Sequence, residues 1–154
     1  MSVLVIGIGN PDRGDDAAGL DVARLLAELA LPGVRVLEAP GDALALLDRW
    51  AGADRVVLVD AAGPMGRPGR IHRLDAIAAP LPRDLALGST HAFGLAQTVE
   101  LARTLGQLPP RLVVYAIEGT RFDTGAALSA PVAEAVAVVA GRIAAELTEG
   151  VAHA

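Results

Sequence analysis

The 154-residue chain contains no cysteine, which excludes disulfide bridges, cysteine-based zinc sites and a thiolate nucleophile. It contains no lysine either, so that arginine supplies all 13 basic residues, and these are dispersed rather than gathered in one run. With 18 acidic residues the formal net charge is −5. The sequence therefore lacks the positive charge that dominates affinity for nucleic acids, and we expect no nucleic-acid partner.

Long apolar runs are also absent. The N-terminal stretch is apolar, but no basic segment precedes it, and Asp12 and Arg13 follow before the core of a signal peptide could be completed. The most apolar later stretch, residues 130–147, is interrupted by Glu134 and Arg142. Nothing reaches the roughly 18 uninterrupted apolar residues of a membrane span. The sequence therefore predicts a cytoplasmic protein that does not enter the membrane.

Short runs rich in β-branched residues alternate with apolar residues at helical spacing. The runs predict strands over residues 3–8, 34–39, 56–60, 69–74 and 112–118. The helical patterns cover residues 17–30, 42–50, 91–105 and 132–147. Near-continuous apolar strands suit a sheet that is covered on both faces. The order β-α-β-α-β-β-α-β-α predicts one α/β domain over residues 1–154, a three-layer α/β/α sandwich with a mostly parallel, five-stranded twisted sheet and helices on both faces.

In an open α/β sheet, ligands bind beyond the carboxyl ends of the strands. The first such place is the loop GNPDRGDD at residues 9–16. It begins like a dinucleotide-binding fingerprint, but Asp12 stands where the third glycine would be, and an acidic loop would repel a pyrophosphate. Taken singly, Asp15 and Asp16 are each better explained as caps at the positive end of the next helix, and we expect one of them to do only that.

Two further positions at the same predicted edge carry side chains that can bind metals. Asp60 ends an apolar strand, so its carboxylate should point into the crevice, where it needs a partner or a cation. His91 lies just inside a predicted helix, with Ser89 or Thr90 as the cap, and the positive helix end would keep the imidazole neutral and able to bind metal. Together with Asp16, these two residues suit a divalent first-row ion that keeps open positions for water or substrate.

Four segments in series resemble motifs of the endopeptidases that mature nickel–iron hydrogenases. They are VLVIGIGNPDRGDDAAGLDVARLL, VVLVDAA, STHAFGLAQTVELARTLGQLPPRLVVYAIEG and LSAPVAEAV, and they follow one another in the order found in that family. The resemblance runs from Val3 to about Leu147. Ala17 and Ala18 replace a glycine-containing dipeptide that is frequent in the family. This difference affects the backbone geometry at the start of the helix and not the atoms that would bind a metal.

The resemblance implies a hydrolase, an aspartic-type endopeptidase that removes the carboxyl-terminal extension of a hydrogenase large-subunit precursor after nickel insertion. Asp16, Asp60 and His91 correspond to the family's metal-binding trio, and they would be both the metal-binding and the catalytic residues. The metal expected is the nickel carried by the substrate, with no organic cofactor. A monomer would be adequate for this task.

Three more residues are expected to line the cleft and bind the substrate, namely Asn10, Glu118 and Gly119. Their alternative role is hydrogen bonding within loops and at strand ends. Because cysteine is absent and Ser89 and Thr90 are better explained as helix caps, we expect no serine, cysteine or threonine nucleophile.

Other functions remain open from the sequence. A response-regulator signalling module shares the acidic pair and the aspartate after the third strand, and Thr90 could be its switch residue, but that class needs a lysine. A peptidyl-tRNA hydrolase shares the opening at residues 7–11, but needs a histidine shortly afterwards and a basic face. A non-catalytic domain that binds a metal or a protein partner is the third alternative.

Overall fold

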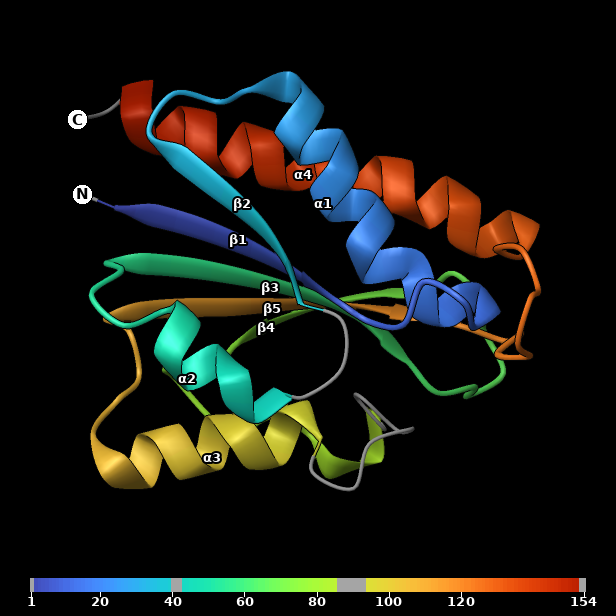
Figure 1. Cartoon of the computed structure of the whole chain (residues 1–154), viewed down its shortest axis with the longest axis horizontal. Helices are drawn as coiled ribbons and strands as arrows, with labels where there is room; N and C mark the ends of the chain where they lie inside the picture. Colours follow the sequence, from blue (N-terminus) through green and yellow to red (C-terminus); the bar gives the residue numbers. More distant parts are fainter. Residues whose placement is uncertain (1, 40–42, 86–93, 153–154) are drawn as a thin grey trace.

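The computed structural model describes residues 2–39, 43–85 and 94–152, and it places one five-stranded sheet between two layers of helices (Figure 1). The strands are β1 (Val3–Ile8), β2 (Val34–Ala39), β3 (Arg55–Ala62), β4 (Ile71–Asp75) and β5 (Arg111–Glu118). The helices are α1 (Ala18–Leu29), α2 (Leu46–Arg49), α3 (Leu95–Leu105) and α4 (Ala130–Ala152). Short 3-10 helices lie at η1 (Gly14–Ala17), η2 (Ala43–Ala45) and η3 (Arg83–Leu85).

The strand order in the sheet is β2-β1-β3-β5-β4. The pairs β1–β2, β1–β3 and β3–β5 are parallel, whereas β4 pairs antiparallel with β5 at the edge. This arrangement confirms the predicted α/β sandwich with its mostly parallel sheet. It differs from the order 2-1-3-4-5 of response regulators, because β5 lies between β3 and β4.

Two apolar layers cover the sheet, and each belongs to one pair of helices. Helices α1 and α4 pack on one face, and α2 and α3 pack on the other (Figure 1). Successive strand residues point to opposite faces: in β3, Val57 and Val59 face α1 and α4, whereas Leu58 and Ala62 face α2 and α3. The same alternation directs Asp60 toward the face covered by α2 and α3.

Two predicted boundaries need correction at the edge where the parallel strands end. β3 continues to Ala62, so Asp60 lies within the strand rather than at its last position. Helix α3 begins at Leu95, after Gly94 in an extended conformation (φ −80°, ψ 179°). The predicted helix start at His91 is therefore wrong, and the argument that a helix end keeps this imidazole neutral loses its basis. His91 itself lies outside the described residues.

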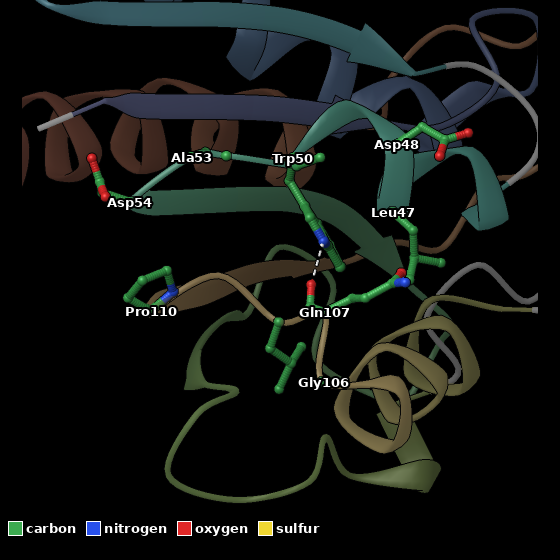
Figure 2. A pocket seen from close by; sticks show the side chains of 11 residues that line it. Leu47, Asp48, Trp50, Ala53, Asp54, Gly106, Gln107 and Pro110 are labelled. Carbon is green, nitrogen blue, oxygen red and sulfur yellow. Dashed lines mark hydrogen bonds between the residues drawn. The ribbon is translucent and has the colours of Figure 1, made fainter.

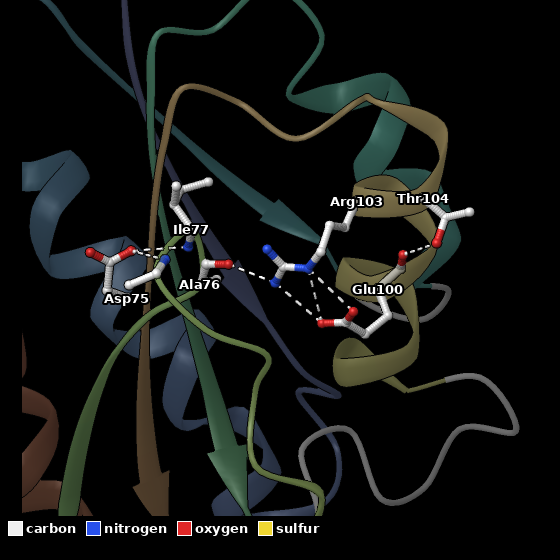
Figure 3. Close-up of polar contacts among 7 residues, drawn as sticks. Asp75, Ala76, Ile77, Glu100, Arg103 and Thr104 are labelled. Carbon is white, nitrogen blue, oxygen red and sulfur yellow. Dashed lines mark hydrogen bonds and ion pairs between the residues drawn. The ribbon is translucent and has the colours of Figure 1, made fainter.

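Helix α3 runs antiparallel to the neighbouring strands, so that it begins on the side of the molecule where β3 and β5 end (Figure 1). Arg103 fixes its other end to the sheet layer, because Nη2 donates a hydrogen bond of 2.7 Å to the carbonyl oxygen of Ala76, just after β4 (Figure 3). The same guanidinium forms an ion pair of 3.2 Å with Glu100, one turn earlier in the helix. The hydrogen bond from Arg103 thus fixes the carboxyl end of α3 to the segment that follows β4.

Helix α1 approaches the sheet closely because it carries glycine where the two meet. A Cβ atom at Gly19 would lie 2.3 Å from the backbone oxygen of Val59 and 2.5 Å from that of Ile8. Gly7 on β1 allows the same approach from the other side, because its added Cβ would lie 2.2 Å from the backbone oxygen of Gly19. The beginning of α1, and with it η1, is therefore held directly against the ends of β1 and β3.

We expect Gly19→Ala to lower the free energy of unfolding by about 1–3 kcal/mol, because the methyl group meets backbone atoms that cannot rotate away. Gly141→Ala is the matched control: Gly141 lies in α4, and an added Cβ there has no atom within 4 Å. That substitution should stabilise by up to about 1 kcal/mol, the usual gain of alanine over glycine in a helix. Urea unfolding of both variants measures the difference, and equal effects would contradict the close packing of α1.

Candidate functional site

The predicted site residues that the structure describes gather at the carboxyl edge of the parallel strands. Asn10 follows β1, Asp16 lies in η1, Asp60 lies near the end of β3, and Glu118 ends β5 with Gly119 directly after it. This edge is where an open α/β sheet binds its ligands. His91, the third member of the predicted metal-binding trio, lies outside the described residues, as do Ser89 and Thr90.

Asp16 and Asp60 are both buried carboxylates, with exposed fractions of 4% and 1%. Oδ1 of Asp60 accepts a hydrogen bond of 2.8 Å from the backbone N–H of Ala61. Oδ2 of Asp16 accepts one of 3.1 Å from the backbone N–H of Asn10. A buried carboxylate is costly unless hydrogen bonds or a cation compensate it, and these backbone donors supply part of that compensation. Carboxylate oxygens are among the ligands that divalent ions prefer.

Asn10 has a local role in the loop after β1. Its side-chain Oδ1 accepts a hydrogen bond of 2.9 Å from the backbone N–H of Asp12, which is two residues later. This bond closes an Asx turn. The preceding Gly9 has φ 151°, and an added Cβ atom would lie 1.9 Å from the backbone oxygen of Asp16. The loop is therefore folded tightly over the start of η1, and the expected role of Asn10 in substrate binding stays a prediction.

Asp15 does not cap a helix, contrary to the expectation for one member of the acidic pair. Neither η1 nor α1 has a side-chain capping bond, and the Asp15 carboxylate is instead buried, with 0% exposed. Oδ2 accepts hydrogen bonds of 2.9 Å from the backbone N–H groups of Thr120 and Arg121. Oδ1 accepts one of 2.7 Å from the backbone N–H of Ser129, whose hydroxyl also donates to the carboxylate. Asp15 thus joins the first loop to the segment between β5 and α4.

These donors determine the charge of Asp15. Burial raises the pKa of its carboxyl, but the hydrogen bonds from Thr120, Ser129 and Arg121 outweigh burial, so that the pKa lies below its ordinary value of 3.8. The carboxylate is therefore ionised at neutral pH, with its charge balanced by backbone amides.

The hydrogen bonds from Thr120, Arg121 and Ser129 to Asp15 form a clamp between the first loop and the segment after β5. Gly119 lies beside this clamp, directly after the end of β5. A Cβ atom on Gly119 would lie 2.8 Å from Cβ of Asp15 and 2.6 Å from the ring of Phe122. Its backbone N–H donates a hydrogen bond of 2.9 Å to the carbonyl oxygen of Ala62 at the end of β3. Close packing thus explains the glycine, and its predicted role in substrate binding stays a prediction.

Glu118 is completely buried and connects β5 to the loop between β3 and β4. Its Oε2 accepts hydrogen bonds from the backbone N–H groups of Met65 (2.9 Å) and Arg67 (2.6 Å). Its Oε1 is also buried but has no hydrogen-bond partner in the part of the chain that the structure describes. The same holds for Nε2 of His72 on β4, a residue that the sequence pattern does not single out.

No group of three or more carboxylate or imidazole side chains among residues 2–39, 43–85 and 94–152 is arranged to hold a metal ion. The predicted trio includes His91, which lies outside these ranges, so the metal site stays a prediction. Within the same ranges, no helix is long and apolar enough to cross a membrane.

A cavity of about 550 Å³ lies away from these residues, at the opposite edge of the sheet (Figure 2). It is lined by residues that precede β3, such as Ala53, and by residues that precede β5, such as Pro110. Trp50 forms part of its wall and donates a hydrogen bond of 3.0 Å from Nε1 to the carbonyl oxygen of Gln107. We assign the candidate site to the carboxyl edge, because the aspartates that line this cavity, Asp48 and Asp54, are exposed, whereas the aspartates at the carboxyl edge are buried.

A family model described as HycI, hydrogenase maturation protease, matches residues 20–146. The chain belongs to the hydrogenase maturation protease family. This finding confirms the family that the sequence motifs predicted and, at the level of the family, the predicted hydrolase class. The matched range includes Asp60, His91 and Glu118 but begins after Asp16.

Two relatives carry the description hydrogenase expression/formation protein HupD. The protein from Thiocapsa roseopersicina is 27% identical over 123 residues, which are 79% of this chain and 56% of that protein. The protein from Bradyrhizobium diazoefficiens is 28% identical over 138 residues, which are 88% of this chain and 72% of that protein. The chain thus spans little more than half of the first relative's length.

Solved structures share the fold over nearly the whole chain. The [NiFe] hydrogenase maturation protease HycI from Thermococcus kodakarensis is similar with a TM-score of 0.76 and 26% identity, over 96% of this chain and 92% of that one. An endopeptidase from Escherichia coli has a TM-score of 0.82 at 22% identity, over 97% of this chain and 94% of that one, which supports the fold alone. The agreement confirms the predicted fold class.

Proposed function

We propose that the chain is an endopeptidase that removes the carboxyl-terminal extension of a nickel–iron hydrogenase large-subunit precursor after nickel has been inserted. The observation that carries this proposal is the match of residues 20–146 to the hydrogenase maturation protease family. The likeness to a [NiFe] hydrogenase maturation protease over 96% of the chain supports the same substrate class. A cytoplasmic location and a monomeric state remain predictions.

In this proposal Asp16, Asp60 and His91 bind the nickel that the precursor already carries. Two carboxylates and an imidazole leave coordination positions for the substrate's own ligands. The backbone bonds from Asn10 to Asp16 and from Ala61 to Asp60 fix one oxygen of each carboxylate. The carboxylates therefore keep their orientation before the precursor arrives, which lowers the cost of ordering them on binding.

Recognition of nickel places the scissile peptide bond against the carboxyl edge of the sheet. Three routes to hydrolysis are consistent with the residues there: the ion polarises the carbonyl, the ion activates a water molecule, or a carboxylate acts as the general base. In each route Asp16 and Asp60 act as charged oxygen donors. The third route, with a carboxylate as the base, is the one that corresponds to the predicted aspartic-type endopeptidase.

The test is a cleavage assay with purified protein and a nickel-loaded large-subunit precursor. We expect the precursor to lose the mass of its carboxyl-terminal extension, as measured by intact-protein mass spectrometry. The same precursor without nickel should stay uncleaved. A protein that co-elutes with the loaded precursor but leaves its mass unchanged would instead be a non-catalytic binding domain.

A further inference from the structure

Two buried polar atoms near Asp60 have no hydrogen-bond partner among the residues that the structure describes. They are Oε1 of Glu118, whose side chain is 0% exposed, and Nε2 of His72. The large majority of buried side-chain polar atoms in folded proteins have a partner, so each exception needs an explanation. Two such atoms on adjacent strands suggest one shared ligand.

The strand register places both side chains on the face of the sheet that carries Asp60. Ala116 on β5 pairs with Asp60 on one side and with His72 on the other. Residues paired across a sheet point to the same face, and Ala116 packs in the layer beneath α2 and α3. Asp60 and His72 therefore flank Ala116 on that face.

Glu118 completes the arrangement. It lies two residues after Ala116 on β5, so it points to the same face, and it is a diagonal neighbour of His72 across the β4–β5 pair. Diagonal neighbours have Cα atoms roughly 7–8 Å apart, within reach of side chains of this length. Ala62 pairs with Glu118 on the other side. Three polar side chains thus surround Ala62 and Ala116, which are both buried in the layer beneath α2 and α3.

The hydrogen-bonding capacity of the His72 imidazole and the Glu118 carboxylate indicates what they can bind. Burial lowers the pKa of His72, and the nearby Arg70 lowers it further, against the opposing effect of Glu118 and Asp84. The imidazole is therefore neutral at physiological pH and has one N–H donor and one acceptor nitrogen. A carboxylate can only accept hydrogen bonds. One acceptor beside one donor complements an amide group, which offers an N–H and a carbonyl oxygen.

A metal ion is a poorer match for these atoms. Among the side chains that the structure describes, Asp60, His72 and Glu118 included, no three are arranged to hold a metal ion. The other oxygen of Glu118 is already occupied by the backbone N–H groups of Met65 and Arg67, which hold the carboxylate in place. The unused oxygen is thus presented by a fixed side chain rather than by a mobile one.

We propose that His72 and Glu118 form a subsite that binds a main-chain amide of the precursor beside Asp60. Oε1 of Glu118 accepts a hydrogen bond from the amide N–H, and the Nε2–H group of His72 donates one to the amide carbonyl. The subsite positions the peptide and leaves the hydrolytic step to the residues of the proposed metal site. This inference rests on the proposed function.

His72→Leu tests the subsite, because leucine keeps most of the apolar volume and removes the donor. We expect the KM for the nickel-loaded precursor to rise about tenfold, the effect of one hydrogen bond to a buried partner, with kcat unchanged. His72→Gln, which returns an N–H donor, should recover part of the loss. His153→Gln is the matched control, since it removes a histidine near the end of the chain, and its KM should equal that of the unchanged protein.

Calorimetry with a precursor that is not cleaved measures binding without hydrolysis. It therefore separates the subsite proposal from the protease proposal. If the unchanged protein cleaves the precursor and His72→Leu has the same KM and affinity, the subsite is wrong while the protease proposal stands. If the unchanged protein does not cleave, the protease proposal fails, and equal affinities of the two proteins would still overturn the subsite.

A third readout follows the unchanged protein itself, and a variant serves only to assign its resonances. The chain has three histidines, so the imidazole nitrogen resonances of His72 can be assigned by comparison with His72→Gln. We expect these resonances in the unchanged protein to shift when the precursor is added, and unmoved resonances in the saturated complex would contradict the proposal.

Discussion

Asp60→Asn is expected to slow cleavage of the nickel-loaded precursor about a thousandfold while the fold is kept. Asparagine has the same shape as aspartate, and its carbonyl oxygen can still accept the N–H of Ala61, which lies 2.8 Å from Oδ1. The substitution removes the negative charge that would grip the nickel or act as the base, and such groups contribute roughly 10²–10⁴ in rate. Single-turnover cleavage, followed by mass spectrometry, measures the loss.

The controls separate chemistry from stability. Asp48→Asn removes the same charge from an exposed position on α2, away from the carboxyl edge, and should leave the rate unchanged. Asp16→Asn and His91→Ala should show the same loss as Asp60→Asn, and all variants should keep the circular dichroism of the folded protein. If Asp60→Asn retains more than about a tenth of the rate, Asp60 is not part of the proposed nickel-binding group.

Much of the fold follows from local patterns in the sequence. The apolar runs at residues 3–8 and 34–39 coincide with β1 and β2, because β-branched residues bounded by glycine and proline strongly favour strands. The strand order could not be predicted in the same way. β5 inserts between β3 and β4 by pairing with segments about 40 to 56 residues away along the chain, which no local pattern encodes.

The candidate site could likewise be predicted from local patterns only in part. Asp16 and Asp60 are recognisable because an aspartate after or within an apolar strand is unusual. The prediction that Asp15 caps a helix is wrong, because capping is a local rule, whereas its actual partners Thr120 and Ser129 are 105 and 114 residues away. No local pattern singles out His72 either, since its significance depends on the long-range register with β5.

Asp15→Ala is expected to lower the free energy of unfolding at neutral pH by about 3–5 kcal/mol. The substitution leaves the backbone N–H groups of Thr120, Arg121 and Ser129 without their acceptor, and each unsatisfied buried donor costs roughly 1–3 kcal/mol. Asp123→Ala, an exposed change in the same loop, should stay within about 0.5 kcal/mol of the unchanged protein. Urea unfolding measures both, and equal stabilities of the two variants would show that the clamp does not hold the loop.

The stability that Asp15 contributes should also depend on pH, and the lowered pKa of its carboxyl determines the direction of the change. Because the folded protein lowers the pKa below the ordinary 3.8, the carboxylate contributes stability that is fully present above about pH 4 and lost as the pH falls through the lower, folded value. Unfolding curves at successive pH values should therefore show the unchanged protein and Asp15→Ala converging below pH 4, whereas the gap to Asp123→Ala stays small throughout. A gap between the unchanged protein and Asp15→Ala that is constant down to pH 2 would mean that the ionised carboxylate is not what binds the three amides, and the attachment of the β5–α4 segment to the first loop would need another cause.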